Sequence, residues 1–339
     1  MTNSDESIYG RSMTNLSNDY LLNAQQISEQ KERLHQVIKN VQSESKSSNS
    51  KRAYASDWKK FIAFCEHIRV SSLPATEQTI TMFCAHMYES NYKRATILRH
   101  LNSILAAHRL KGFKMDYLPS LDTFIKGMKR DRGAKQNGKK AIEIDLLLQL
   151  VNLVPKDNSV LSIRDKFVLL FSFSSSRRRS ELSSLDVEHI QLQADGLIVY
   201  IERSKTDQEG KGESILIPYG QHSSTCPVQA YFNWIEAAQI DSGPLFRPVT
   251  KMDKPLAKRL SGASISTIVK KYIDLAGLDS SEYGAHSLRA GFVTTARRKG
   301  KADHQIMAQT GHSSSIMLDR YTRLNMLDAR NSSAKDLGL

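Results

Sequence analysis

Four short patterns in the second half of the sequence combine residue types that suit chemistry on a phosphate ester. They are Arg178-x-x-Glu181, the lysine Lys205, His286-x-x-Arg289, and Gly311-His312 followed nine residues after the histidine by Tyr321. Guanidinium groups are planar, permanently charged forks that match phosphate oxygens, on which negative charge grows as phosphorus becomes five-coordinate. A tyrosine that attacks phosphorus needs a base, because its phenol has an ordinary pKa of ~10. His286 is the candidate base, and the arginines need no metal ion to neutralise charge.

The order and spacing of these patterns resemble those of the tyrosine recombinases, which include phage-type integrases, Xer-like resolvases and Cre-like enzymes. The family pattern is Arg-x-x-Glu, a hairpin lysine, His-x-x-Arg, Gly-His or Gly-Trp, and a tyrosine nine residues later. The resemblance covers the catalytic half, and the layout is most similar to Cre-like members. It implies a site-specific recombinase that cleaves and rejoins duplex DNA through a 3′-phosphotyrosyl link, without metal, ATP or other cofactor.

The resemblance also implies a role for each site residue. Lys205 protonates the departing 5′-oxygen, and His312 hydrogen-bonds the scissile phosphate. The family's catalytic arginine stands three residues before the acidic residue, which selects Arg178 and gives Glu181 an orienting role.

One short stretch departs from the family pattern. Thr-Gly-Leu often precedes the catalytic arginine, where this chain has Ser175-Ser176-Arg177. Without the glycine, a positive φ at this turn is less accessible. The flanking Arg177 and Arg179 are expected to serve packing or to contact backbone phosphates.

Other roles, or another residue, are possible for several of these positions. Lys211 lies in the same hairpin as Lys205, and the run Arg177–Arg179 can be a solvated face. His286 and His312 can bind zinc, although no cysteine pair or carboxylate stands at ligand spacing nearby. Rival functions for the whole chain are a type IB-like topoisomerase, a catalytically inactive DNA-binding protein and a helical transcription regulator.

If the chain follows the family, four copies act on two sites, each an inverted repeat around a spacer. The partners are then double-stranded DNA and three further copies of the chain. The C-terminal segment 326–339 either docks on a neighbouring subunit or forms a frayed tail.

The elements that must position these residues follow from apolar periodicity. Residues 1–50 read as a polar tail with one helix near 21–41. Helical faces follow at Tyr54–Cys65, Ile80–Met87 and Ile97–His108, with a fourth helix near 120–130. These patterns predict an all-helical, DNA-binding bundle over 51–134.

The segment 143–325 is expected to be a mixed α/β, mostly helical catalytic domain with a small antiparallel sheet. Helices are predicted at 143–154 and 162–175, from Glu181, and after Cys226. Two strand-like stretches, 196–206 and 213–219, are predicted to form a hairpin. The fold class is therefore mainly α in both domains.

A basic, glycine-containing linker is expected between these domains at 135–142, within a stretch that can bind phosphates or be a solvated loop. The candidate DNA contacts are Lys93, Arg94 and Arg99 on a helix that also carries His100, together with Lys129, Arg130, Arg132, Lys135, Lys139 and Lys140.

Composition agrees with a nucleic-acid partner. The 339 residues carry 48 Lys+Arg against 35 Asp+Glu, a net charge of +13, which favours a polyanion. Three scattered cysteines predict neither a disulfide framework nor a zinc cluster. With no secretory signal or membrane span in the pattern, we expect a cytoplasmic, DNA-associated protein.

Overall fold

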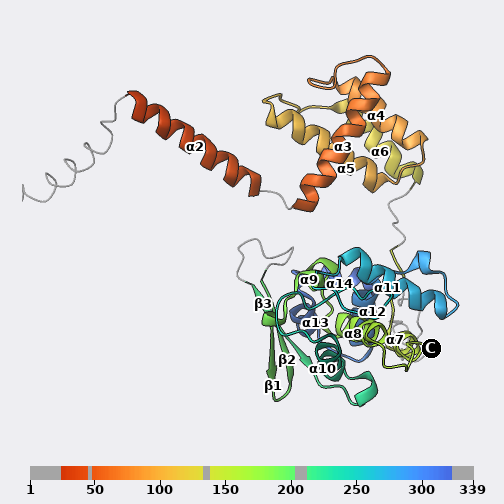
Figure 1. Cartoon of the computed structure of the whole chain (residues 1–339). Helices are drawn as coiled ribbons and strands as arrows, with labels where there is room; N and C mark the ends of the chain where they lie inside the picture. The colour runs from red at the N-terminus through yellow and green to blue at the C-terminus, as the bar shows by residue number, and fades with distance from the viewer. Residues whose placement is uncertain (1–23, 45–47, 133–137, 203–211, 323–339) are drawn as a thin grey trace, which may run out of the picture. The chain divides into compact units, whose positions relative to one another are not determined.

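The computed structural model describes the backbone of residues 24–44, 48–132, 138–202 and 212–322, and side chains within 27–37, 50–131, 138–202 and 212–319. The chain divides into two compact units, Met1–Gln136 and Asn137–Leu339 (Figure 1). We refer to them as the N-terminal and C-terminal units. In the described ranges, every helix is too short or too polar to cross a membrane.

The N-terminal unit is built from helices alone in its described part. They are α2 (Ala24–Glu44), α3 (Ser48–His67), α4 (Glu77–Glu89), α5 (Arg94–Leu110) and α6 (Pro119–Arg132). The predicted apolar faces meet in one core, which includes Phe61, Phe83 and Ile97. The predicted bundle is therefore confirmed, although α3 begins within the stretch expected to be a tail.

The C-terminal unit combines helices with one small sheet. Its helices are α7 (Ile144–Asn152), α8 (Val160–Ser175), α9 (Arg179–Ser184), α10 (Pro227–Ala238), α11 (Gly262–Leu275), α12 (Ala285–Arg298), α13 (Asp303–Thr310) and α14 (Ser315–Thr322), with 3-10 turns η1 (Val187–His189), η2 (Ser223–Thr225) and η3 (Ser280–Glu282). The strands are β1 (Ile190–Gln193), β2 (Gly196–Ile201) and β3 (Glu213–Pro218).

The sheet is antiparallel in the order β1-β2-β3. Strands β2 and β3 are the predicted hairpin partners, whereas β1 was not predicted. Alternate residues of β2 and β3 face the core, and Leu197 pairs with Ile217 and Val199 with Ile215. The sheet therefore covers α8 and α10 with one apolar face.

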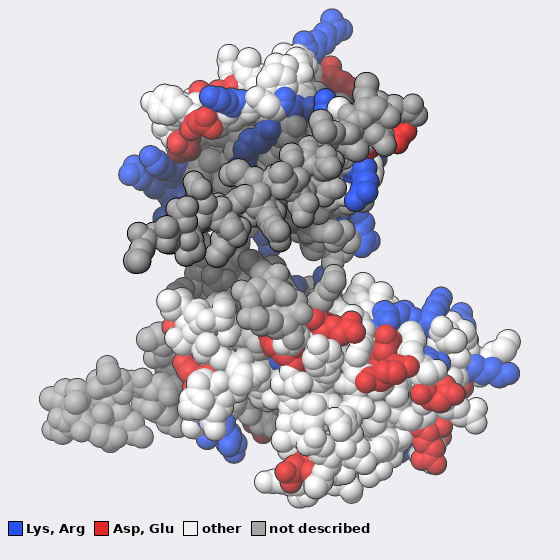
Figure 2. Space-filling model, turned by 90° about the vertical axis from the view of Figure 1, so that its left-hand side faces the viewer, with Lys and Arg blue, Asp and Glu red and all other residues white. Residues whose placement is uncertain are grey.

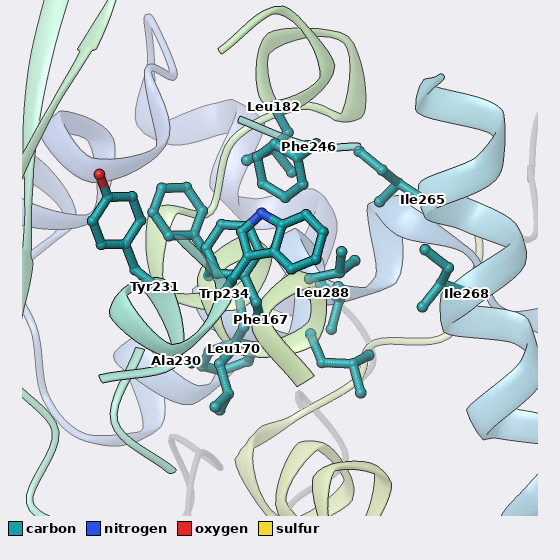
Figure 3. Packing of buried hydrophobic residues seen from close by; sticks show 14 of the residues in the cluster. Phe167, Leu170, Leu182, Ala230, Tyr231, Trp234, Phe246, Ile265, Ile268 and Leu288 are labelled. Atoms are coloured by element: carbon teal, nitrogen blue, oxygen red, sulfur yellow. The ribbon is translucent and has the colours of Figure 1, made fainter. Parts of the chain in front are cut away.

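Helix α8 runs through the centre of this unit. Phe167 and Phe171 on α8 pack against Phe246, and Phe167 stacks on Trp234 of α10 (Figure 3). The Trp234 indole is fully buried and donates its Nε1–H to the Leu245 carbonyl at 2.8 Å. This aromatic packing holds the C-terminal end of α8, where Arg178 follows.

The second half of the expected linker is part of the C-terminal unit. Ile142 is fully buried, and its amide donates to the Ser287 carbonyl at 2.9 Å. A Cβ on Gly291 would lie 1.6 Å from the Ile142 carbonyl oxygen, so this segment touches the backbone of α12. Residues 142–143 therefore pack on the helix that carries His286 and Arg289.

Candidate active site

Arg178 stands at the junction between α8 and α9. Helix α8 ends at Ser175, and the next residue, Ser176, adopts a left-handed conformation with φ 51° and ψ 26°. This is the position where the family often has glycine. The turn is thus retained without the glycine, at a cost of about 1 kcal/mol for an L-residue in this region.

Glu181 binds both the backbone N–H and the guanidinium of Arg178. Its carboxylate accepts the Arg178 backbone N–H at 3.0 Å and the Arg178 Nη1–H at 2.7 Å. Glu181 is buried, whereas the Arg178 side chain is 18% exposed. Because one end of the guanidinium is fixed by a buried carboxylate, Arg178 has few orientations open to it.

Arg289 enters the same region from α12 and is fully buried. Its Nη1 donates to the carbonyls of Ser176, at 2.6 Å, and of Thr310, and its Nη2 lies 2.9 Å from His312 Nε2. None of these three acceptors carries a formal negative charge. The left-handed turn at Ser176 therefore directs a carbonyl to Arg289.

The hydrogen bonds around His312 specify a neutral imidazole. Arginine can only donate, so His312 Nε2 accepts from Arg289. His312 Nδ1 then carries the proton and donates to Thr310 Oγ1 at 2.7 Å, while the Thr310 hydroxyl donates to the Ile306 carbonyl at 2.7 Å. Burial and then the charges of Arg289 and Arg178 lower the pKa of His312 to about 3.

His286 lies in the first turn of α12 and reaches the surface. Partial loss of hydration, followed by the charges of Arg289, Arg178 and Arg179, lowers the pKa of His286. An imidazole in this setting is neutral at pH 7 and can accept a proton.

Tyr321 belongs to the last described helix. Helix α14 packs on α12 and α13 through Leu318, which is buried with Val293 and Ile306. The Tyr321 backbone is in this helix, but its side chain lies outside the described residues. Lys205 and its alternative Lys211 also lie outside them, between β2 and β3.

Arg177 has the first of the two roles expected for it, which is packing. Its side chain is fully buried, and Nη1 donates to Glu213 Oε2 on β3 at 2.7 Å. Arg177 therefore packs inside the unit and does not contact backbone phosphates. Arg179 is exposed, as a phosphate contact requires.

Three contributors to this site were not predicted from the sequence. The Ser176 carbonyl, the Thr310 hydroxyl and the Glu213 carboxylate each hold a candidate residue or its neighbour. The only local signal is that Thr310 stands two residues before His312. Within the described residues, no group of three or more His, Cys, Asp or Glu side chains is placed to hold a metal ion.

The candidate DNA contacts fall in varied settings. Lys129 and Arg130 are exposed on α6, and Arg99 on α5 pairs with buried Asp57 at 3.0 Å. Lys139 donates to the Ser281 carbonyl, and Lys140 pairs with Glu282. Lys93 precedes α5, Arg94 begins it, and neither Lys135 nor the Arg132 side chain is described.

His100, on the same helix, is a core residue. Its side chain is 1% exposed and lies 3.2 Å from the buried Asp57 carboxylate. Helical spacing places it beside Phe83 in the core. Figure 2 shows Lys and Arg together with Asp and Glu among the described residues on the visible face of each unit.

Comparisons with known proteins relate this chain to a protein family and to a curated relative. The model of the phage integrase family matches residues 141–327. The chain is 34% identical over 318 residues to the "Integrase/recombinase xerD homolog" of Selenomonas ruminantium, covering 93% of each chain.

Solved structures share the fold at low sequence identity. The XerH site-specific recombinase bound to difH substrate matches with a TM-score of 0.55 and 16% identity, over 83% of this chain and 79% of that one. A lambda integrase tetramer bound to a Holliday junction matches with a TM-score of 0.54 and 15% identity, over 85% of this chain and 75% of that one.

Proposed function

The chain belongs to the phage integrase family and is a tyrosine recombinase of the Xer type, and from this premise we propose a mechanism and an assembly for it. In this proposal Tyr321 cleaves one DNA strand at each of two sites. The strands are then exchanged through 3′-phosphotyrosyl intermediates, and no metal or ATP takes part.

One observation supports the mechanism above all others. Side chains from three separate segments act on one another electrostatically: Arg178 before α9, His286 and Arg289 on α12, and His312 before α14. Two guanidinium groups next to two neutral imidazoles suit a single phosphodiester, because the arginines neutralise its charge while the imidazoles accept or donate hydrogen bonds.

The cleavage step balances as a transesterification. The Tyr321 phenolic oxygen attacks phosphorus and loses its proton to His286, and the bond from phosphorus to the 5′-oxygen breaks. Arg178 and Arg289 hold the nonbridging oxygens. His312, whose Nε2 accepts from Arg289 in the free protein, donates to the phosphate once its proton has moved from Nδ1 to Nε2. Because one phosphate ester replaces another, the reverse attack by a 5′-hydroxyl from the partner duplex rejoins the strand without an energy source.

Lys205 completes the proposed chemistry as the acid for the 5′-oxygen. An ammonium on a flexible stem can reach a leaving oxygen and give up its proton. This assignment rests on the family pattern, since Lys205 lies outside the described residues.

We further propose that both units grip duplex DNA and that four copies act on two inverted-repeat sites. The lambda integrase tetramer on a Holliday junction is the structural precedent for such an assembly. In the N-terminal unit, the proposed contacts are Lys93 just before α5, Arg94 and Arg99 on α5, and Lys129 and Arg130 on α6.

The test starts by selecting the preferred binding site from random-sequence DNA and nicking it near the cleavage position, so that the cut end diffuses away. Wild-type protein should accumulate a covalent DNA complex and exchange strands between two such sites. Tyr321→Phe should bind DNA within about twofold of wild type and form no covalent complex, because only the nucleophile is lost. Tyr219→Phe, at a half-exposed tyrosine after β3, is the matched control and should cleave normally.

A different result would reject parts of the proposal separately. Covalent complex in Tyr321→Phe would reject the nucleophile. Cleavage and relaxation of supercoiled DNA without exchange between sites would indicate a topoisomerase.

A further inference from the structure

Arg177 is a buried cation whose position gives it a task in the proposed mechanism. Its side chain has no exposed surface, and its Nε and Nη2 have no hydrogen-bond partner among the described residues. Burying such a charge is costly unless a counterion holds it. Glu213, at the start of β3, supplies that counterion through Nη1 at 2.7 Å.

The ion pair lies directly on the turn that carries His312. Gly311 has φ +67°, and a Cβ there would come within 2.6 Å of Arg177 Nη1 and 3.0 Å of Glu213 Oε2. The guanidinium and the carboxylate therefore rest against the Gly311 backbone, and no side chain fits between them. Gly311 is adjacent in sequence to His312.

A second contact joins the same three segments independently. The Gln309 side-chain amide donates to the Ser174 carbonyl at 2.9 Å and to the Leu216 carbonyl at 3.2 Å. Gln309 belongs to α13, Ser174 to α8 and Leu216 to β3. The end of α8, strand β3 and the end of α13 are thus held together by a second set of contacts besides the ion pair.

We propose that Arg177 is a positioning residue, whose ion pair with Glu213 braces the Gly311–His312 turn and so places His312 at the scissile phosphate. The inference rests on the proposed function of His312. It gives this chain's departure from Thr-Gly-Leu a purpose, because an arginine at the third position reaches β3 and carries a charge that leucine lacks.

The test compares variants of the full chain in single-turnover cleavage at saturating DNA. Arg177→Leu removes the ion pair. Glu213→Gln keeps the shape of the acceptor but removes its charge. Because Glu213 borders an open hollow lined by Ser214, Met307 and Ser313, the substitution requires no repacking of neighbouring side chains. Arg164→Leu is the matched control: Arg164 is a buried arginine on α8 that pairs with Asp165 at 2.6 Å. It lies eleven helical positions before Ser175, about 16 Å along the axis.

We expect Arg177→Leu and Glu213→Gln to cleave at least about tenfold more slowly per folded molecule, since small displacements of a catalytic group have effects of this size. The DNA dissociation constant should stay within about twofold of the wild-type value. Arg164→Leu should lose stability but cleave at the wild-type rate.

A substrate with a neutral methylphosphonate at the scissile position separates positioning from a general loss of structure. If the ion pair acts by placing His312 to hydrogen-bond a charged nonbridging oxygen, the difference in cleavage rate between wild type and the two variants should shrink on this substrate. A structural defect would slow both substrates equally.

Two results would overturn the inference: wild-type cleavage by Glu213→Gln, or equal losses in all three variants on both substrates. Failure of the proposed function is a distinct outcome, because wild-type protein would then form no covalent DNA complex at all. If Arg177→Leu does not fold, Glu213→Gln alone decides the question.

Discussion

At the scale of single residues, Ser176 shows how this chain keeps an expected turn with an unexpected residue. It adopts φ 51°, is fully buried, and its hydroxyl has no partner in the part of the chain that is described. Its carbonyl nonetheless accepts from Arg289. A mutation can therefore relieve the strain of the left-handed backbone at Ser176 while keeping the carbonyl that accepts from Arg289.

Ser176→Gly should raise the free energy of unfolding of the C-terminal unit by about 1 kcal/mol, because glycine tolerates the left-handed region and removes the unpaired hydroxyl. Urea unfolding followed by Trp234 fluorescence in a Trp58→Phe background measures this. Ser175→Gly, in the last turn of α8, is the control and should destabilise by about 0.5–1 kcal/mol. If Ser176→Gly destabilised the unit as Ser175→Gly does, the backbone of Ser176 would not be strained.

The neutral state of His312 predicts a pH dependence of stability. Its folded pKa of about 3 lies below the ordinary value of 6.5, so between these values the unfolded chain binds more protons. This contribution is fully present above pH 6.5 and is lost as the pH falls toward 3. From pH 7.0 to 5.5, His312 alone should remove about 1 kcal/mol from the free energy of unfolding.

His312→Gln, which keeps an acceptor but cannot titrate, should show a shallower pH dependence than wild type in the same urea experiment. Identical slopes for the two proteins would mean that the His312 imidazole is not held neutral. His286, whose pKa is also lowered, adds to the slope in both proteins.

At the scale of elements, periodicity predicted the long helices and the β2–β3 hairpin because their apolar residues repeat at 3.6 or 2 positions. Strand β1 was missed, since its four residues, IQLQ, bury no side chain fully. Family spacing identified Arg178, but the contact between Arg177 and Glu213 joins residues 36 positions apart. No local pattern encodes such a contact, because it depends on how β3 packs beside α8.

Helix α12 depends on a close approach that only glycine allows. Gly291→Ala would place its Cβ 1.6 Å from the Ile142 carbonyl oxygen, which belongs to the backbone and cannot rotate away. The backbone of Ile142 and Glu143 must then separate from α12. We expect the free energy of unfolding to fall by about 1–3 kcal/mol or more, as in other overpacked cores, and the melting temperature to fall with it.

Ala290→Gly is the control for the helix itself. It lowers helix propensity one residue away, at a cost of about 1 kcal/mol, without creating a clash. Equal melting temperatures for Gly291→Ala and wild type would contradict the close packing between α12 and residues 142–143.

At the scale of the whole molecule, the net charge of +13 predicts DNA affinity that falls steeply with salt. Each cation that neutralises a phosphate contributes about −0.9 to the slope of log affinity against log salt. Replacing both Lys129 and Arg130 by alanine should therefore make the slope shallower by roughly 1.8 if both contact phosphates.

Lys251→Ala, at an exposed lysine of the C-terminal unit outside the proposed contacts, is the control and should leave the slope unchanged. Binding titrations at several salt concentrations give the slopes directly. Equal slopes for wild type and the double variant would remove α6 from the DNA-binding surface.

The most direct test of the central claim is to identify the residue that becomes attached to DNA. Wild-type protein is trapped on the nicked site, the complex is digested with protease and nuclease, and the nucleotide-bearing peptide is sequenced by mass spectrometry. The account predicts a 3′-phosphate ester on Tyr321. Attachment to any other residue, or a 5′-linked phosphate, would contradict it.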